Sequence, residues 1–225
     1  MDGRDSRRGG LSGSAALDLH SYNTPMRTIY VDFGNVIGFF DHQRAIAKLA
    51  AFTDVPPHEL TLALYGSALE DDYETGKIRT SEYVRQAKLN GRLTCSDEDF
   101  LAAFVDIFWR NDEVCDLLAK LKPKYRLVLA SNTNDAHYRK YSQQFADVLM
   151  HFAALCPSHY AGHRKPHREY FEFCQRHTQA AIRDCVFIDD YPSNIEAAKA
   201  FGWQSILYRP GQDLAGKLKA VGVEV

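Results

Sequence analysis

Short apolar segments alternate with amphipathic segments through the second half of the chain, and this alternation limits the fold more than any other feature. Apolar runs rich in β-branched residues predict five strands, at 28–31, 126–130, 153–156, 185–188 and 205–208. Between them, apolar residues recur at helical spacing, as in Val114, Leu117, Leu118 and Leu121. Strands that alternate with helices predict an α/β fold built on a doubly wound parallel sheet.

The first half of the chain departs from this alternation. The first strand ends just before Asp32, yet the next begins only at Arg126, and the residues between them show helical patterns without a strand pattern. One helical stripe in this interval consists of Leu101, Phe104, Val105 and Phe108. We therefore expect a small all-helical cap at residues 42–112, inserted after the first strand into a core formed by residues 26–41 and 113–225.

The N-terminal segment has a different character from the rest. Residues 1–25 are rich in Arg, Gly, Ser and Asp and have no apolar periodicity, so they predict a disordered extension. Met26 stands directly before the first strand and is a candidate start of the natural chain.

Charge and composition exclude several classes of partner. Basic and acidic residues nearly balance, 27 against 29, which gives no electrostatic reason to expect nucleic acid or an anionic membrane surface. No apolar run approaches the roughly 18 residues of a membrane-spanning helix, and the N-terminus lacks the apolar core of a signal peptide. The five cysteines are an odd number without a C-x-x-C pair, as for free thiols in the cytoplasm. We expect a cytoplasmic monomer or weak dimer.

Polar side chains come directly after three of the predicted strands, and one more lies in a loop. They are Asp32, Ser131 with Asn132, Lys165, and Asp189 with Asp190. Ligands of open α/β sheets bind outside the carboxyl ends of the strands, so these groups predict a single site. Two adjacent carboxylates beside a third would repel one another without a cation, which favours a site for a metal and a phosphate.

Each of these residues also has an ordinary structural interpretation. Asp32 could be a turn residue, and Ser131 with Asn132 could begin the next helix. Lys165 could be a solvated loop lysine, and Asp189 with Asp190 could complement a helix dipole. The functional interpretation rests on all of them occurring together.

Four motifs in order carry a resemblance to a known family. They read Ile-Tyr-Val-Asp-Phe-Gly-Asn-Val at 29–36, Leu-Ala-Ser-Asn-Thr at 129–133, Arg-Lys-Pro at 164–166, and Phe-Ile-Asp-Asp-Tyr-Pro-Ser-Asn at 187–194. This set resembles the haloacid dehalogenase superfamily, most of whose members are phosphatases on a Rossmann-like core. The long insertion after the first motif is similar to the helical cap of that family.

The resemblance implies a role for each motif residue. Asp32 would attack phosphorus and form an aspartyl-phosphate. Mg²⁺ would be held by Asp32, the backbone carbonyl of Gly34 and Asp190, with Asp189 and Asn194 steadying its bound waters. Ser131, Asn132 and Lys165 would bind phosphate oxygens, and Lys165 would offset charge during the transfer. The implied function is Mg²⁺-dependent hydrolysis of a small phosphorylated metabolite, such as a sugar phosphate.

One position departs from the commoner phosphatase pattern. The residue two places after the nucleophile is usually a second Asp that serves as general acid, and here it is Gly34. A subgroup of the family carries this Asp-x-Gly-Asn-Val motif. Either the substrate has a good leaving group, or another residue donates the proton. The donors that we consider are Asp41, His42, Asp72 and Glu74.

The cap is expected to select the substrate through residues 65–76, with Phe39 and Phe40 as an apolar wall or as core. Two other functions stay open. A haloacid dehalogenase also uses an Asp nucleophile, but relatives of that kind lack the acidic pair Asp189-Asp190. A non-catalytic module of the same fold would bind a phosphorylated ligand without turning it over.

Overall fold

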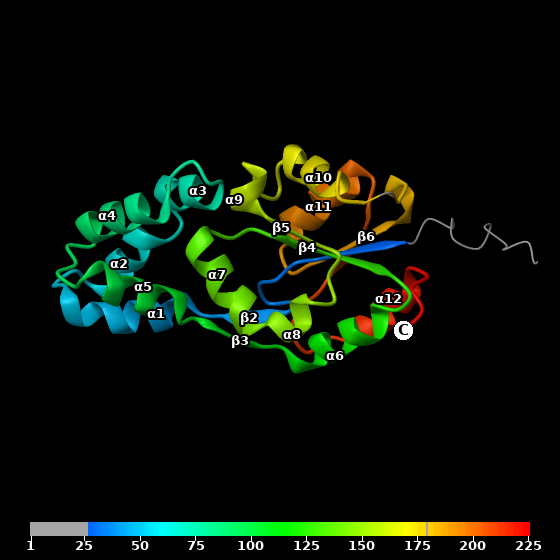
Figure 1. Ribbon diagram of the computed structural model, residues 1–225, viewed down its shortest axis with the longest axis horizontal. Coiled ribbons are helices and arrows are strands. Elements are labelled where there is room, and N and C mark those ends of the chain that lie inside the picture. Colours follow the sequence, from blue (N-terminus) through cyan, green and yellow to red (C-terminus); the bar gives the residue numbers. More distant parts are fainter. Residues whose placement is uncertain (1–26, 179) are drawn as a thin grey trace, which may run out of the picture.

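A five-stranded parallel sheet forms the centre of the molecule in the computed structural model, which describes residues 27–178 and 180–225 (Figure 1). The expectations for residues 1–25 and Met26 lie outside these residues. The strand order is β5-β4-β1-β6-β7, and all four pairings are parallel. The strands are β1 (Thr28–Val31), β4 (Arg126–Ser131), β5 (Ala154–Pro157), β6 (Cys185–Asp189) and β7 (Gln204–Leu207). All five expected strands are therefore present, with every end within one residue of its predicted position.

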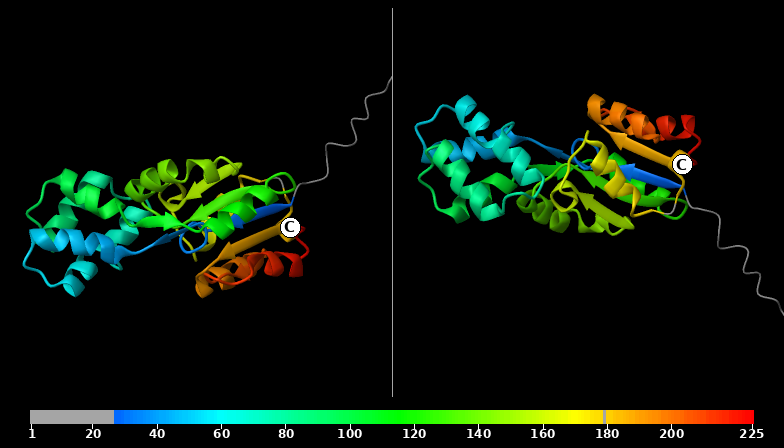
Figure 2. Two further views of the ribbon diagram at one scale, coloured as in Figure 1. Left: turned by 90° about the horizontal axis from the view of Figure 1, so that it is seen from below. Right: turned by 90° about the horizontal axis from the view of Figure 1, so that it is seen from above.

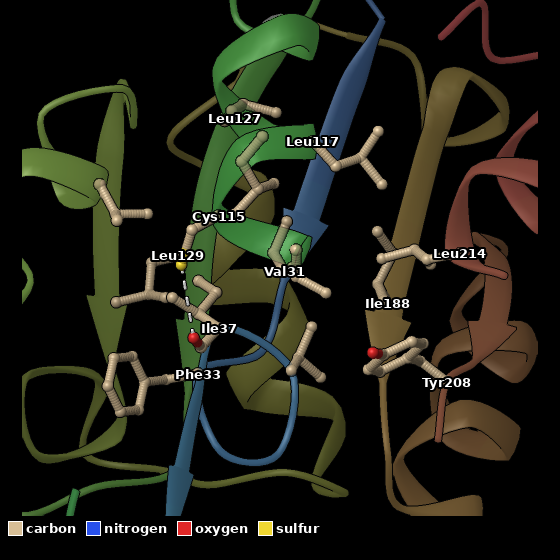
Figure 3. Packing of buried hydrophobic residues seen from close by; sticks show 14 of the residues in the cluster. Val31, Phe33, Ile37, Cys115, Leu117, Leu127, Leu129, Ile188, Tyr208 and Leu214 are labelled. Atoms are coloured by element: carbon tan, nitrogen blue, oxygen red, sulfur yellow. Dashed lines mark hydrogen bonds between the residues drawn. The ribbon is translucent and has the colours of Figure 1, made fainter. Parts of the chain in front are cut away.

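Helices cover both faces of this sheet, which confirms the doubly wound fold (Figures 1 and 2). Successive residues of β1 point to opposite faces, so Ile29 and Val31 belong to one apolar cluster and Tyr30 to the other. The first cluster includes residues of α6 (Asp112–Leu121), α7 (Asp135–Gln144), α8 (Ala146–Leu149) and α12 (Leu214–Ala220). Figure 3 shows Val31, Leu129 and Ile188 of the sheet in the same cluster as Leu117 and Leu214 of the covering helices. The second cluster includes residues of α10 (Arg168–Gln175) and α11 (Pro192–Phe201).

A separate group of helices lies at the far end of the elongated molecule (Figure 1). It consists of α1 (His42–Leu49), η2 (Ala50–Phe52), α2 (Pro57–Leu64), α3 (Ala68–Glu74), α4 (Thr80–Asn90) and α5 (Asp97–Val105). These helices enclose their own apolar cluster, which includes Leu60, Tyr83 and Phe100. We call this group the cap and the remainder the core.

A two-stranded antiparallel sheet joins the cap to the core, and the sequence did not predict it. The strands are β2 (Gly38–Phe40) and β3 (Phe108–Arg110). The interval 42–112 is therefore helical only as far as Val105. Asn111 fixes this connection to the core, because its buried side-chain amide donates to the carbonyl oxygen of Val36 at 2.8 Å.

Two smaller features bear on the sequence expectations. All five cysteines are free and buried. Among the described residues, no helix combines the length and the apolar character that crossing a membrane requires. The remaining short elements are α9 (Ser158–Ala161) and η3 (Ile182–Asp184).

Candidate active site

The polar residues at the strand ends meet on one edge of the sheet. Asp32 follows β1, Ser131 ends β4 and Asp189 ends β6, and these three strands are neighbours with parallel direction. Lys165 reaches the same edge from the loop between α9 and α10. A cavity of about 470 Å³ lies over this edge, and Asp32, Lys165 and Asp190 line it.

Lys165 is held more tightly than a loop lysine would be. Only 2% of the residue is exposed, although its side chain is charged. Its Nζ atom donates to Asp32 Oδ1 at 2.7 Å, to Asp189 Oδ2 at 2.7 Å and to the carbonyl oxygen of Ala130 at 2.8 Å. Burial lowers the pKa of the ammonium, but the two carboxylates outweigh burial and raise it, so Lys165 is a fixed positive charge.

Asn132 lines the cavity and also positions Lys165 through its side chain. Its amide nitrogen donates to the carbonyl oxygen of Lys165 at 2.9 Å, and its amide oxygen accepts the N–H of Lys165 at 2.8 Å. This reciprocal pair ties the end of β4 to the loop that carries the lysine. Ser131 is 2% exposed and lines a smaller cavity of about 90 Å³ next to Gly34 and Phe40.

Three carboxylates crowd this one lysine. Asp32, Asp189 and Asp190 each place a carboxylate oxygen within 4.8 Å of the other two. Burial raises the pKa of Asp32, and repulsion from Asp189 and Asp190 acts in the same direction, while Lys165 opposes both. Burial also raises the pKa of Asp190. One ammonium cannot compensate three carboxylates, so the site has the charge and the hard oxygen donors that suit a divalent cation.

The three carboxylates do not have equal freedom to bind a metal. Both oxygens of Asp189 accept hydrogen bonds from protein groups, namely from Lys165, the N–H of Tyr191 and the amide of Asn194. Asp190 is half-buried, and its Oδ2 atom accepts from the Asn35 amide at 2.9 Å. Asp32 and Asp190 are therefore better placed than Asp189 to contact an ion, and the backbone of Gly34 lines the same cavity.

The cap contributes to the cavity wall. Of the four proton donors considered from the sequence, His42 and Glu74 line the 470 Å³ cavity, whereas Asp41 and Asp72 do not. Glu70, which belongs to the segment 65–76 expected to contact the substrate, also lines it, and so does Arg164, to which the sequence assigned no role. Glu70 lies one turn before Glu74 on α3, so the helical period places both carboxyl groups on one face.

Comparisons with known proteins agree with this architecture. The family model of haloacid dehalogenase-like hydrolases matches residues 26–202. A D-ribitol-5-phosphate phosphatase from Bacteroides thetaiotaomicron is 24% identical over 205 residues, which cover 87% of this chain and 98% of that protein. A haloacid dehalogenase (HAD) family enzyme from the same organism, solved in complex with magnesium and inorganic phosphate, has a TM-score of 0.74 at 22% identity, covering 85% of this chain and 98% of that one.

A further solved structure, a predicted HAD-like family hydrolase from Porphyromonas gingivalis, has a TM-score of 0.76 at 20% identity and covers 90% of this chain and all of that one. At such identities the solved structures show a shared fold. The family model identifies the family of this chain. Its match covers residues 26–202, which include Asp32, Lys165, Asp189 and Asp190. The chain belongs to the haloacid dehalogenase-like hydrolases.

Proposed function

We propose that the chain is a Mg²⁺-dependent phosphatase that hydrolyses monoesters of small metabolites through an aspartyl-phosphate on Asp32. The observation that carries the proposal is the arrangement of Asp32: a buried carboxylate fixed by Lys165 on one oxygen, with Asp190 within 4.8 Å. Such a group combines a positioned nucleophile with charge compensation, which phosphoryl transfer to a carboxylate requires.

Each residue then has a defined part. Lys165 holds Asp32 by its Oδ1 atom, so Oδ2 is the oxygen that attacks phosphorus. Asp189 keeps Lys165 charged and oriented through its 2.7 Å hydrogen bond. Mg²⁺, held by Asp32, Asp190 and the carbonyl of Gly34, would neutralise the phosphate and keep Asp32 ionised. The reciprocal pair of Asn132 fixes the backbone of the lysine loop.

The substrate class is a sugar phosphate or polyol phosphate. Two carboxyl groups of the cap, Glu70 and Glu74, line the cavity and can bond hydroxyl groups of such a substrate. The cavity of about 470 Å³ suits a small metabolite. The similar Bacteroides enzyme is named a D-ribitol-5-phosphate phosphatase, which supports the same class. Five free thiols support a cytoplasmic location, which cell fractionation would test.

A second candidate is a module that binds a phosphorylated ligand without hydrolysing it. Gly34, in place of the usual general acid, favours this alternative, because the loss of a general acid typically lowers rates by about 10²–10⁴-fold. A dehalogenase is disfavoured by the crowded carboxylates, which such an enzyme does not require.

Hydrolysis of p-nitrophenyl phosphate with and without Mg²⁺ tests the two candidates, because this leaving group hardly needs an acid. We expect Mg²⁺-dependent turnover in the wild type and none in Asp32→Asn. Binding of inorganic phosphate by calorimetry, without turnover of p-nitrophenyl phosphate or of a panel of sugar phosphates, would favour the binding module instead.

A further inference from the structure

An aromatic ring fills the place where a proton donor at position 34 would stand. A Cβ atom added to Gly34 would lie 3.9 Å from Asp32 Oδ2, the oxygen that Lys165 leaves free. It would also lie 2.8 Å from Cε1 of Phe40, closer than carbon atoms pack without a bond. Phe40 therefore occupies this space, and an ester with a poor leaving group needs a proton from another element.

We propose that Glu74 of the cap helix α3 donates that proton, an inference that rests on the proposed phosphatase function. Glu74 lines the 470 Å³ cavity together with Asp32 and Lys165. Its side chain is 13% exposed, and its Oε2 atom makes no hydrogen bond among residues 27–178 and 180–225, although it forms an ion pair with Arg164 Nη1 at 3.2 Å. The ion pair leaves the Glu74 carboxyl without a hydrogen bond at Oε2, and an oxygen of a bound ester can accept one from its protonated form.

Burial of Glu74 favours its protonated form near neutral pH. Burial raises the pKa of the Glu74 carboxyl to about 7. The carboxylates of Glu70 and Asp71, on the same helix, act in the same direction. Two cations of the facing loop, Arg164 at 3.2 Å and Lys165, oppose them. A general acid works best when its pKa lies near the working pH, and Glu74 meets that condition.

The other acids near the site are less suited. Asp41, the N-cap of α1, does not line the cavity, and neither does Asp72, which pairs with Lys77 at 3.0 Å. Burial lowers the pKa of His42 to about 4, so its imidazole carries no extra proton at pH 7. Glu70 lines the cavity, but its Oε2 atom accepts the N–H of Gly66 at 2.5 Å.

The proposed reaction has two halves, the formation of the aspartyl-phosphate and its hydrolysis. Asp32 forms a bond to phosphorus, the bond from phosphorus to the ester oxygen breaks, and its electron pair stays on that oxygen. The oxygen takes the proton of Glu74, which releases a neutral alcohol and leaves Glu74 as a carboxylate. A water molecule then attacks phosphorus and gives a proton to Glu74. The bond from phosphorus to Asp32 breaks with its electron pair left on the Asp32 carboxylate, and inorganic phosphate leaves.

Two esters with different leaving groups test the inference in the full-length protein. Glu74→Gln keeps the shape of the side chain but cannot donate an acidic proton. We expect kcat for D-ribitol 5-phosphate, an alkyl ester, to fall by about 10²–10⁴-fold, and kcat for p-nitrophenyl phosphate to fall by less than about tenfold. Retained turnover of p-nitrophenyl phosphate also shows that the variant is folded.

Glu70→Gln is the matched control, because Glu70 lies one turn away on the same helix and lines the same cavity. We expect it to raise KM for the polyol ester without the large loss in kcat. The wild-type kcat for that ester should fall as the pH rises above about 7, the value to which burial raises the pKa of Glu74, and Glu74→Gln should remove this limb.

The outcomes separate the two proposals. Equal losses in kcat for both esters in Glu74→Gln, or an unchanged pH limb, would overturn the role of Glu74 and leave the phosphatase function standing. Wild-type protein that hydrolyses neither ester in the presence of Mg²⁺ would overturn both.

Discussion

A lysine whose ammonium donates to three buried acceptors is part of the architecture of its site. Lys165 links Asp32, Asp189 and the carbonyl oxygen of Ala130, which come from three neighbouring strands. Removal of Lys165 would leave two buried carboxylates unpaired, a change that costs about 3–5 kcal/mol when a buried ion pair is broken. Lys165 therefore combines a chemical role with a structural one, and its substitution alone cannot separate them.

Asp190 offers a cleaner test of the metal site, because it is only half-buried and does not bond to Lys165. We expect Asp190→Asn to leave the metal-free protein as stable as the wild type or more stable, since one of three crowded carboxylates becomes neutral. In the wild type, Mg²⁺ at a hundred times its Kd should add about 2.7 kcal/mol of stability. Thermal unfolding with and without Mg²⁺ measures both effects, with the surface change Asp116→Asn as control. An equal Mg²⁺ shift in Asp190→Asn would remove Asp190 from the site.

Position 34 gives a second prediction about a single residue. An Asp at position 34 must displace Phe40, whose ring lies 2.8 Å from the new Cβ atom. We expect Gly34→Asp to destabilise the protein by about 1–3 kcal/mol, as overpacking does. Urea unfolding of Gly34→Asp, Phe40→Ala and the double variant forms a cycle in which the double variant should lose less than the sum. Additive losses would mean that Phe40 does not fill the space.

The sequence predicted which residues meet at this site better than the contacts among them. The residues at the strand ends could be identified because parallel neighbouring strands bring their carboxyl ends to one edge, whatever the side chains between them. The pairing of Asn132 with the backbone of Lys165 could not, because it depends on the path of a loop. The bond from Asn35 to Asp190 was missed for the same reason: Asn35 has a φ of 54°, and the pattern of the motif does not reveal that conformation.

At the scale of elements, the sequence predicted the five strands of the central sheet but not the three-residue strands β2 and β3. The stripe Val114, Leu117, Leu118 and Leu121 is buried in α6 as expected. The stripe that included Phe108 was wrong at its end, because α5 stops at Val105 and Phe108 enters β3. Three-residue strands such as β2 and β3 carry too few residues to show a period of two, and their pairing joins positions about 70 residues apart.

A buried histidine links two elements across the boundary between core and cap. His137 of α7 accepts a hydrogen bond at Nδ1 from the Asn134 amide at 3.0 Å. Its Nε2–H donates to the carbonyl oxygen of Phe104 in α5 at 3.1 Å. Acceptance at Nδ1 requires the neutral ring, and burial, the largest effect, lowers the pKa of His137 to about 3, although the bond to Phe104 opposes this. The imidazole is therefore a contact that acid should weaken.

The sign of the pH dependence follows from this shift. Between the ordinary pKa of 6.5 and about 3, the unfolded chain binds a proton that the folded chain does not, so this residue makes stability fall as the pH falls below 6.5. Its contribution is at most about 1.4 kcal/mol per pH unit. We expect His137→Gln to be less stable at pH 7.5 but to have a flatter slope between pH 6.5 and 4.5, measured by urea unfolding. Parallel slopes would contradict the assignment.

At the scale of the whole molecule, the cap rests on the core through polar contacts beside an open space. A hollow of about 760 Å³ at the boundary is lined by Tyr73 and Thr80 of the cap and by Asp135 of the core, and none of the strand-end groups lines it. The N–H of Ala136 donates to the Tyr73 hydroxyl at 3.1 Å, this hydroxyl donates to Thr80 Oγ1 at 2.9 Å, and Thr80 donates to Asp135 at 2.8 Å. Sequence patterns could not predict this series of hydrogen bonds, because it depends on how two separately packed units meet.

The Tyr73 hydroxyl is in the middle of these hydrogen bonds, so Tyr73→Phe should weaken the contact of the cap with the core. The change removes one hydroxyl and leaves the buried N–H of Ala136 without its partner, a loss of about 1–3 kcal/mol. Because the cap supplies Glu70 and Glu74 to the cavity, a less closed cap should raise KM for a phosphate ester more than it lowers kcat. Small-angle X-ray scattering should show a larger radius of gyration. Tyr125→Phe is the control, because its hydroxyl accepts the N–H of Glu224 at 2.8 Å, far from the cap. If Tyr73→Phe and Tyr125→Phe give the same KM and the same radius, these hydrogen bonds do not hold the cap against the core.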